Sequence, residues 1–112
     1  SPLHDKMVSA ASHIPYLMAQ LCLKAGQTLS KTELPLFKQI IASGFYDTTR
    51  VANSDPDWGR DICHYNKENL VKNLETIAKE SQDLIQLIKD NNTEALTDYF
   101  NKGRNFRKSL YD

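Results

Sequence analysis

A short segment of this chain brings together side chains that could bind an anion. Arg50 follows two threonines, and its planar guanidinium can hold a carboxylate or a phosphate through two parallel hydrogen bonds. Asp47, three residues earlier, is placed to orient that guanidinium. Residues 45–54 show little helical periodicity, so we expect a functional loop there. The alternative is a helix N-cap with an ordinary surface ion pair.

The bound anion is expected to be a small organic acid. A nucleotide is a poorer candidate, because the chain has no glycine-rich phosphate loop. Trp58 follows Arg50 closely enough to form one wall of such a pocket. The alternative for Trp58 is a tryptophan packed in the core.

A second group of polar side chains lies near the N-terminus. His13 and Tyr16 are three residues apart and so share one face of a helix, with Ser12 beside them. Pro15 lacks a backbone donor and frees a carbonyl in the preceding turn, which could present Ser12 and His13 to a cleft. Considered alone, these residues favour the alternative of a histidine whose hydrogen bonds are satisfied in the core or an interface.

The residues able to bind a metal do not form a metal-binding pattern. His4 precedes His13 by nine residues, which places the two on opposite faces of a regular helix. No histidine pair at a spacing of four and no close cysteine pair occurs, so we predict no metal. Cys22 and Cys63 are isolated, and we expect buried thiols in a reducing cytoplasm instead of a disulfide.

Composition limits the class of protein. The 112 residues suffice for one domain, and 40% hydrophobic with 25% charged residues is typical of a soluble globular chain. Fourteen basic residues balance fourteen acidic ones, so nothing indicates binding to nucleic acid or an anionic membrane. The apolar runs are too short to span a membrane. A start at Ser1 instead of Met suggests a fragment of a longer chain.

The elements that position these residues are expected to be helices. Apolar residues recur every three or four positions, and no segment alternates as a strand does, so the fold class is all-α. Pro15 should kink the first helix near Ala11 and Ser12, Gly26 should end it, and Thr32 should cap the second, which Gly44 ends. The expected helices cover residues 4–24, 32–43, 55–90 and 93–111.

Two of these helices are long for so small a chain. One copy cannot cover their whole apolar stripes, so we expect a homodimer in which helices cross between subunits. The alternative is a monomeric bundle.

Taken together, the motifs resemble those of a known enzyme family. His4-Asp5, Ser12-His13-Ile14-Pro15, residues 45–52 (FYDTTRVA) and Ser54-Asp55-Pro56 are similar to the C-terminal domain of prephenate dehydrogenases. The resemblance covers nearly the whole chain. It implies that residues 1–112 form a helical dimerisation and substrate-binding domain, like the C-terminal domain of 6-phosphogluconate dehydrogenase. It also implies an N-terminal Rossmann domain that is absent from this chain.

The resemblance implies an activity for the full-length protein. Such enzymes oxidatively decarboxylate prephenate to 4-hydroxyphenylpyruvate in tyrosine biosynthesis, or act on arogenate, and tyrosine is a possible inhibitor. The cofactor, NAD or NADP, would bind mainly to the missing domain, which also holds the histidine that polarises the substrate hydroxyl. This chain alone is therefore expected to be inactive.

Individual roles follow from the same resemblance. Arg50 would grip a substrate carboxylate, Asp47 would orient Arg50, and Ser12 and His13 would line the substrate pocket.

Two departures from the family pattern concern the pocket. The family usually reads Ser-His-x-Pro-His, whereas Tyr16 stands at the last position here. That position is linked in the family to recognition of the substrate side chain and to inhibition by tyrosine. The segment from Ser54 to Trp58, near the pocket mouth, is one residue shorter than usual before the tryptophan.

Two further classes compete with this interpretation. In a phosphotransfer module His13 would be phosphorylated, but that pattern needs an acid directly after the histidine, where Ile14 stands. A plain dimerisation module without a ligand would leave Arg50 and Asp47 unexplained. Binding of a carboxylate would distinguish the dehydrogenase from both.

Overall fold

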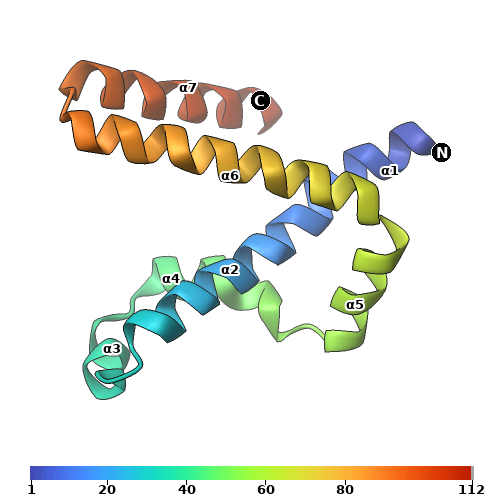
Figure 1. Cartoon of the computed structure of the whole chain (residues 1–112), viewed down its shortest axis with the longest axis horizontal. Helices are drawn as coiled ribbons and strands as arrows, with labels where there is room; N and C mark the ends of the chain where they lie inside the picture. The colour runs from blue at the N-terminus through green and yellow to red at the C-terminus, as the bar shows by residue number, and fades with distance from the viewer. Residues whose placement is uncertain (112) are drawn as a thin grey trace. The chain divides into compact units, whose positions relative to one another are not determined.

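The computed structural model describes residues 1–111, and helices account for nearly all of them (Figure 1). No strand occurs in this part of the chain, so the predicted all-α class is confirmed. The chain forms two compact units, Ser1–Leu74 and the part from Glu75 onward. In order, the elements are α1 (Pro2–Val8), a π-helical turn (Ser9–His13), α2 (Ile14–Leu29), α3 (Leu34–Ile40), α4 (Ser43–Thr49), a 3-10 turn (Arg50–Asn53), α5 (Pro56–Tyr65), α6 (Lys67–Asp90) and α7 (Thr93–Tyr111).

The first helical segment is interrupted where its proline predicts a disturbance. Pro15 has no N–H to donate to the preceding turn, and the backbone there widens into the π-helical turn, with the Ile14 N–H bonded to the Ser9 carbonyl. The structure thus places a π-helical turn where the kink near Ala11 and Ser12 is predicted. This turn shifts His13 from the position it would have in a regular α-helix.

Gly26 does not end this helix, contrary to expectation, because α2 continues to Leu29. Gly26 is buried instead, and a Cβ atom there would lie 3.2 Å from the ring of Phe37 and 3.4 Å from that of Phe45. The two rings meet edge to face, with centroids 5.5 Å apart. The glycine thus allows close packing and is not a stop signal.

The predicted boundaries over residues 32–54 are wrong. Thr32 does not cap a helix, because α3 begins only after Glu33, and Gly44 lies in the first turn of α4 instead of ending a helix. Residues 45–53 are helical and not a loop. Packing of Phe45 holds α4 in place, and the Thr49 hydroxyl donates to the Phe45 carbonyl at 2.7 Å.

The predicted helix start at Asp55 is confirmed, but the single helix over residues 55–90 is not. The Asp55 carboxylate accepts a hydrogen bond from the Asp57 N–H at 2.9 Å, and Pro56 occupies the first helical position. The helix then breaks at Asn66, which separates α5 from α6. The predicted helix over residues 93–111 is confirmed as α7.

The turn between α6 and α7 is short. Asn91 takes a left-handed backbone conformation, with φ of 53°, which asparagine tolerates better than most residues. The Asn92 side chain then accepts a hydrogen bond from the Ala95 N–H at 3.1 Å.

The core of the first unit lies where α2, α5 and the start of α6 meet. Its buried apolar side chains are Ile14, Tyr16, Ala19, Ile62 and Leu70.

The expectation of two buried thiols fails for Cys63. It is exposed because the inward face of α5 carries Gly59 and Ile62, whereas Cys22 is half-buried. Both cysteines are free, as predicted.

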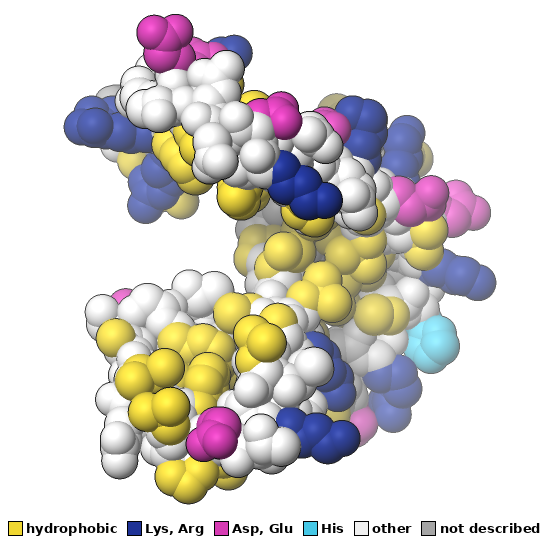
Figure 2. Space-filling model, turned by 60° about the vertical axis from the view of Figure 1, so that its left-hand side comes forward, with side chains coloured by type: hydrophobic (Ala, Val, Ile, Leu, Met, Phe, Trp, Pro, Cys, Tyr) yellow, Lys and Arg dark blue, Asp and Glu magenta, His cyan; other side chains and the backbone are white. Residues whose placement is uncertain are grey.

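Each unit exposes large apolar side chains. In the first unit they include Leu34, Leu36 and Ile40 of α3. Figure 2 shows hydrophobic side chains gathered in patches on the face in view. In the second unit they include Phe100 and Phe106, and no residue of 75–111 is fully buried. None of the described helices is long and apolar enough to cross a membrane.

Candidate functional site

A pocket of about 340 Å³ opens between the N-terminal helical segment and α5. Side chains from α1, the π-helical turn and α5 line it: His4, Asp5, Val8, His13, Trp58, Asp61, Ile62 and Tyr65. It therefore combines an apolar wall with imidazole, carboxylate and phenol groups.

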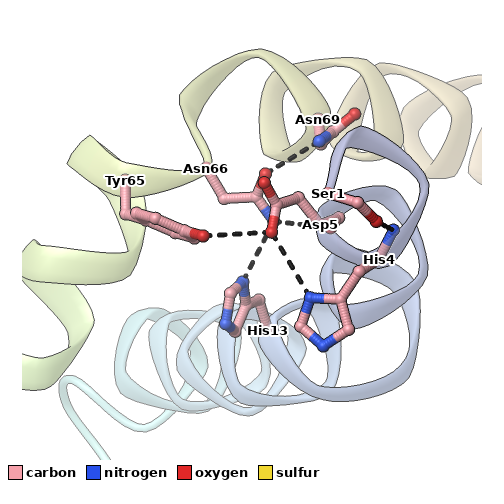
Figure 3. Close-up of polar contacts among 7 residues, drawn as sticks. All are labelled: Ser1, His4, Asp5, His13, Tyr65, Asn66 and Asn69. Atoms are coloured by element: carbon pink, nitrogen blue, oxygen red, sulfur yellow. Dashed lines mark hydrogen bonds and ion pairs between the residues drawn. The ribbon is translucent and has the colours of Figure 1, made fainter.

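His13 is the buried polar group of this pocket, with 7% of its surface exposed. Its Nδ1 lies 3.3 Å from Nδ2 of Asn66 (Figure 3), and its ring meets that of Trp58 edge to face, with centroids 6.1 Å apart. Among the described residues, no group is hydrogen-bonded to Nε2. One ring nitrogen thus contacts Asn66, and the described residues leave the other without a hydrogen bond.

Asp5 anchors the neighbouring part of the pocket. The Tyr65 hydroxyl donates to Oδ1 of Asp5 at 3.0 Å, and Nδ1 of His4 lies 3.5 Å from the same oxygen (Figure 3). The bond from Tyr65 lowers the pKa of Asp5, with a smaller contribution from His4. The same bond raises the pKa of Tyr65.

Three asparagines lie at the break before α6 and in its first turns. Two of them bond the N-terminal segment directly and the third bonds Asn66, a role that sequence reasoning missed. Nδ2 of Asn66 donates to the Asp5 carbonyl at 2.9 Å, and its Oδ1 accepts from Asn69 at 2.8 Å. Asn73 donates to Oγ of Ser9 at 2.6 Å. Their spacing of three and then four residues, on the face that carries Leu70 and Leu74, is the signal that could have revealed them.

Tyr16 packs beside the pocket. Its ring meets Trp58 edge to face, with centroids 4.8 Å apart, and its hydroxyl accepts a hydrogen bond from Gln20 at 3.2 Å. A Cβ atom on Gly59 would lie only 2.7 Å from that hydroxyl. Tyr16 therefore occupies the space that a side chain at position 59 would need.

The structure brings some of the predicted site residues together. His13 and Trp58 share the pocket, and Tyr16 contacts Trp58. Trp58 keeps 40% of its surface exposed, so it is a pocket wall and not a core residue. Ser12 is exposed on the π-helical turn.

The other three predicted residues lie on the segment after α3. Asp47, Arg50 and Ser54 are all exposed, and the Ser54 hydroxyl donates to the Val51 carbonyl at 2.7 Å. Within the described part of the chain, no ion pair joins Asp47 to Arg50. The Arg50 guanidinium is therefore available to an external anion.

Metal ligands do not gather in the described residues, where no three His, Cys, Asp or Glu side chains converge. The absence of a metal from the functional protein remains a prediction.

Comparison with known proteins identifies the family to which this chain belongs. The family described as "Prephenate dehydrogenase, dimerization domain" matches residues 1–102. The helical fold and this match define the chain as a dimerization domain. The chain belongs to the prephenate dehydrogenase family.

Individual relatives agree. The chain is 32% identical to a prephenate dehydrogenase of Bacillus subtilis (strain 168), over 96% of this chain and 29% of that protein. It superimposes with a TM-score of 0.87 on the prephenate dehydrogenase from A. aeolicus in complex with hydroxyphenyl propionate and NAD+, at 35% identity, over 97% of this chain and 38% of that one. On the arogenate dehydrogenase of Synechocystis, the chain superimposes with a TM-score of 0.88 at 26% identity, over 96% of this chain and 39% of that one.

The chain thus spans 29% to 39% of the length of these relatives. It corresponds to their C-terminal part.

Proposed function

We propose that this chain is the C-terminal dimerisation and substrate-binding domain of a dehydrogenase that converts prephenate to 4-hydroxyphenylpyruvate in tyrosine biosynthesis. An N-terminal Rossmann domain would precede it in the full-length protein. The observation that carries the proposal is His13, which is buried beside Trp58 in the lining of the pocket.

The reaction demands recognition of a ring with two carboxylates. Hydride leaves the ring carbon that bears the hydroxyl, and carbon dioxide leaves the opposite carbon. The hydroxyl proton, taken up by a base as hydride leaves, returns to the oxygen when the ring becomes aromatic, so that the product is a phenol and no net proton is released. Trp58 and Ile62 provide an apolar wall suited to such a ring. His13 supplies a polar contact, Ser12 lies beside it, and Arg50 is proposed to hold a carboxylate that would be costly to bury unpaired.

The nicotinamide cofactor, NAD or NADP, accepts the hydride when bound. This chain carries no glycine-rich dinucleotide motif, so the cofactor is assigned mainly to the N-terminal domain. The proposal accordingly expects no turnover by this chain alone.

Dimerisation is proposed from the family and from the exposed apolar side chains of α3 and α7. A second copy of the chain would cover such surfaces, as apolar helix faces in homodimers commonly are. A cytoplasmic location agrees with two free thiols in the chain.

Arogenate is the alternative substrate, because one similar structure is named an arogenate dehydrogenase. Tyr16 lies against Trp58 at the edge of the pocket, where it is proposed to influence this choice and any inhibition by tyrosine.

A steady-state assay of the full-length protein tests the proposal, with prephenate and arogenate each offered with NAD and with NADP. Reduction of the cofactor with either acid supports it, and the better pair identifies substrate and cofactor. A folded, dimeric protein that turns over neither acid would overturn it.

A further inference from the structure

The Asn66 side chain can take only one orientation. Its Nδ2 lies 2.9 Å from the carbonyl oxygen of Asp5, and a carbonyl oxygen only accepts hydrogen bonds. Its Oδ1 lies 2.8 Å from Nδ2 of Asn69, which donates to it. If the Asn66 amide were turned over, its oxygen would face the Asp5 carbonyl oxygen. The NH₂ group therefore points toward Asp5.

The same NH₂ group faces His13. Nδ2 of Asn66 lies 3.3 Å from Nδ1 of His13, so one of its hydrogens bonds Asp5 and the other is available to the imidazole (Figure 3). Because Asn66 donates, Nδ1 of His13 must accept through its lone pair. A neutral imidazole that accepts at Nδ1 carries its proton on Nε2.

We propose that Asn66 is a positioning residue that holds His13 as the Nε2–H tautomer, so that His13 presents a hydrogen-bond donor to the pocket. Burial supports this assignment, because Asn66 is 4% and His13 is 7% exposed, and water competes little for their contact. No described residue is bonded to Nε2.

The surrounding helices fix the position of Asn66. Asn66 occupies the break between α5 and α6, so its backbone position is set by two helices. The π-helical turn that ends at His13 is tied to α6 separately, through the 2.6 Å bond between Asn73 and Ser9.

The consequence for binding rests on the proposed function. A donor at Nε2 selects an oxygen acceptor, such as a carboxylate, a carbonyl or a hydroxyl oxygen of the substrate. It would not accept a proton from a substrate hydroxyl, so His13 is a binding group and not the base of the oxidation.

The tautomer is measured directly by long-range ¹H–¹⁵N NMR of the full-length protein labelled at histidine, with the His13 signals assigned by their loss in His13→Gln. We expect an unprotonated Nδ1 and a protonated Nε2. Asn66→Asp cannot donate to Nδ1, so its His13 should carry a proton on Nδ1. If circular dichroism shows that Asn66→Asp is unfolded, Asn66→Ala replaces it and should give a mixture of both tautomers.

Asn73→Ala is the matched control, since Asn73 is an α6 asparagine that bonds Ser9 instead of His13. It should keep the wild-type pattern. A proton on Nδ1 of His13 in the wild type would overturn the proposal, as would an unchanged Nε2–H pattern in the folded Asn66 variant. The spectra need no turnover, so a folded protein that turns over neither prephenate nor arogenate would refute the proposed function without deciding the tautomer.

Discussion

At the scale of residues, Tyr16 and Gly59 are fitted to each other. The phenol hydroxyl lies where a Cβ atom on Gly59 would be, and the ring rests against Trp58. The family resemblance of the sequence motifs implies a histidine at position 16, whereas this chain has a tyrosine whose hydroxyl is bonded to Gln20.

Tyr16→His in the full-length protein should therefore change the choice between prephenate and arogenate. A cationic imidazole favours the pyruvyl side chain of prephenate over the ammonium-bearing side chain of arogenate. We expect the ratio of kcat/KM for the two acids to move toward prephenate by about tenfold, the equivalent of one charge-assisted hydrogen bond. Tyr16→Phe, which keeps the ring, is the control. An equal ratio in wild type and Tyr16→His would show that position 16 selects nothing.

The bond between Tyr65 and Asp5 gives a prediction about pH. Because the pKa of Asp5 is lowered on folding, its ionised form stabilises the fold above about pH 4, where an unfolded carboxyl titrates. That contribution is lost as the pH falls through the lowered value. The pKa of Tyr65 is raised, so its contribution is present below about pH 10 and lost as the pH rises through the raised value.

Tyr65→Phe should move the Asp5 titration upward toward the usual carboxyl range, measured by carboxyl ¹³C NMR. Tyr46→Phe is the control, since Tyr46 is an exposed tyrosine on another helix. An Asp5 titration that is the same in wild type and Tyr65→Phe would show that the phenol does not hold the carboxylate.

At the scale of elements, the glycines of α5 and α7 differ in the space around them. Gly59 faces the phenol of Tyr16, whereas Gly103 has nothing within 4 Å of the position of a Cβ atom. Gly59→Ala should destabilise the protein by about 1–3 kcal/mol through overpacking. Gly103→Ala should stabilise it by up to about 1 kcal/mol through helix propensity. Urea unfolding measures both, and a stabilised Gly59→Ala would contradict the close fit.

The sequence predicted the elements that carry local signals. Asp55-Pro56 marks a helix start by its chemistry, and Pro15 marks a disturbed turn, so both could be located. The helical state of residues 45–53 could not be predicted, because Phe45 packs against Phe37 and Gly26, which lie outside this segment.

The site was predicted unevenly for the same reason. The motif around His13 and the position of Trp58 pointed to one pocket, and the structure brings the two together. The role of Asn66 could not be predicted, since a polar residue inside a predicted continuous helix is expected to be exposed until its partners in α1 and the π-helical turn are known. For Asp47 and Arg50, the spacing of three residues predicted a contact, but no ion pair joins them in the described part of the chain.

At the scale of the whole molecule, exposed apolar side chains require a partner surface. The full-length protein should sediment as a dimer at micromolar concentration. Phe106, 66% exposed on α7, is a suitable probe, and Phe106→Asp should raise the dimer dissociation constant at least about tenfold. Lys108→Asp, an exposed substitution on the same helix, is the control. A wild-type monomer would contradict the dimer.

The central claim is that this helical domain contributes substrate-binding groups, and Arg50 tests it most directly. The measurement is the KM for prephenate of full-length Arg50→Ala, with Arg104→Ala on α7 as a charge-matched control. Loss of a charge-assisted bond of about 1.5–3 kcal/mol should raise KM about tenfold to a hundredfold, while the control stays near wild type. An unchanged KM in a folded Arg50→Ala enzyme would contradict the carboxylate-binding role and leave the domain a dimerisation module.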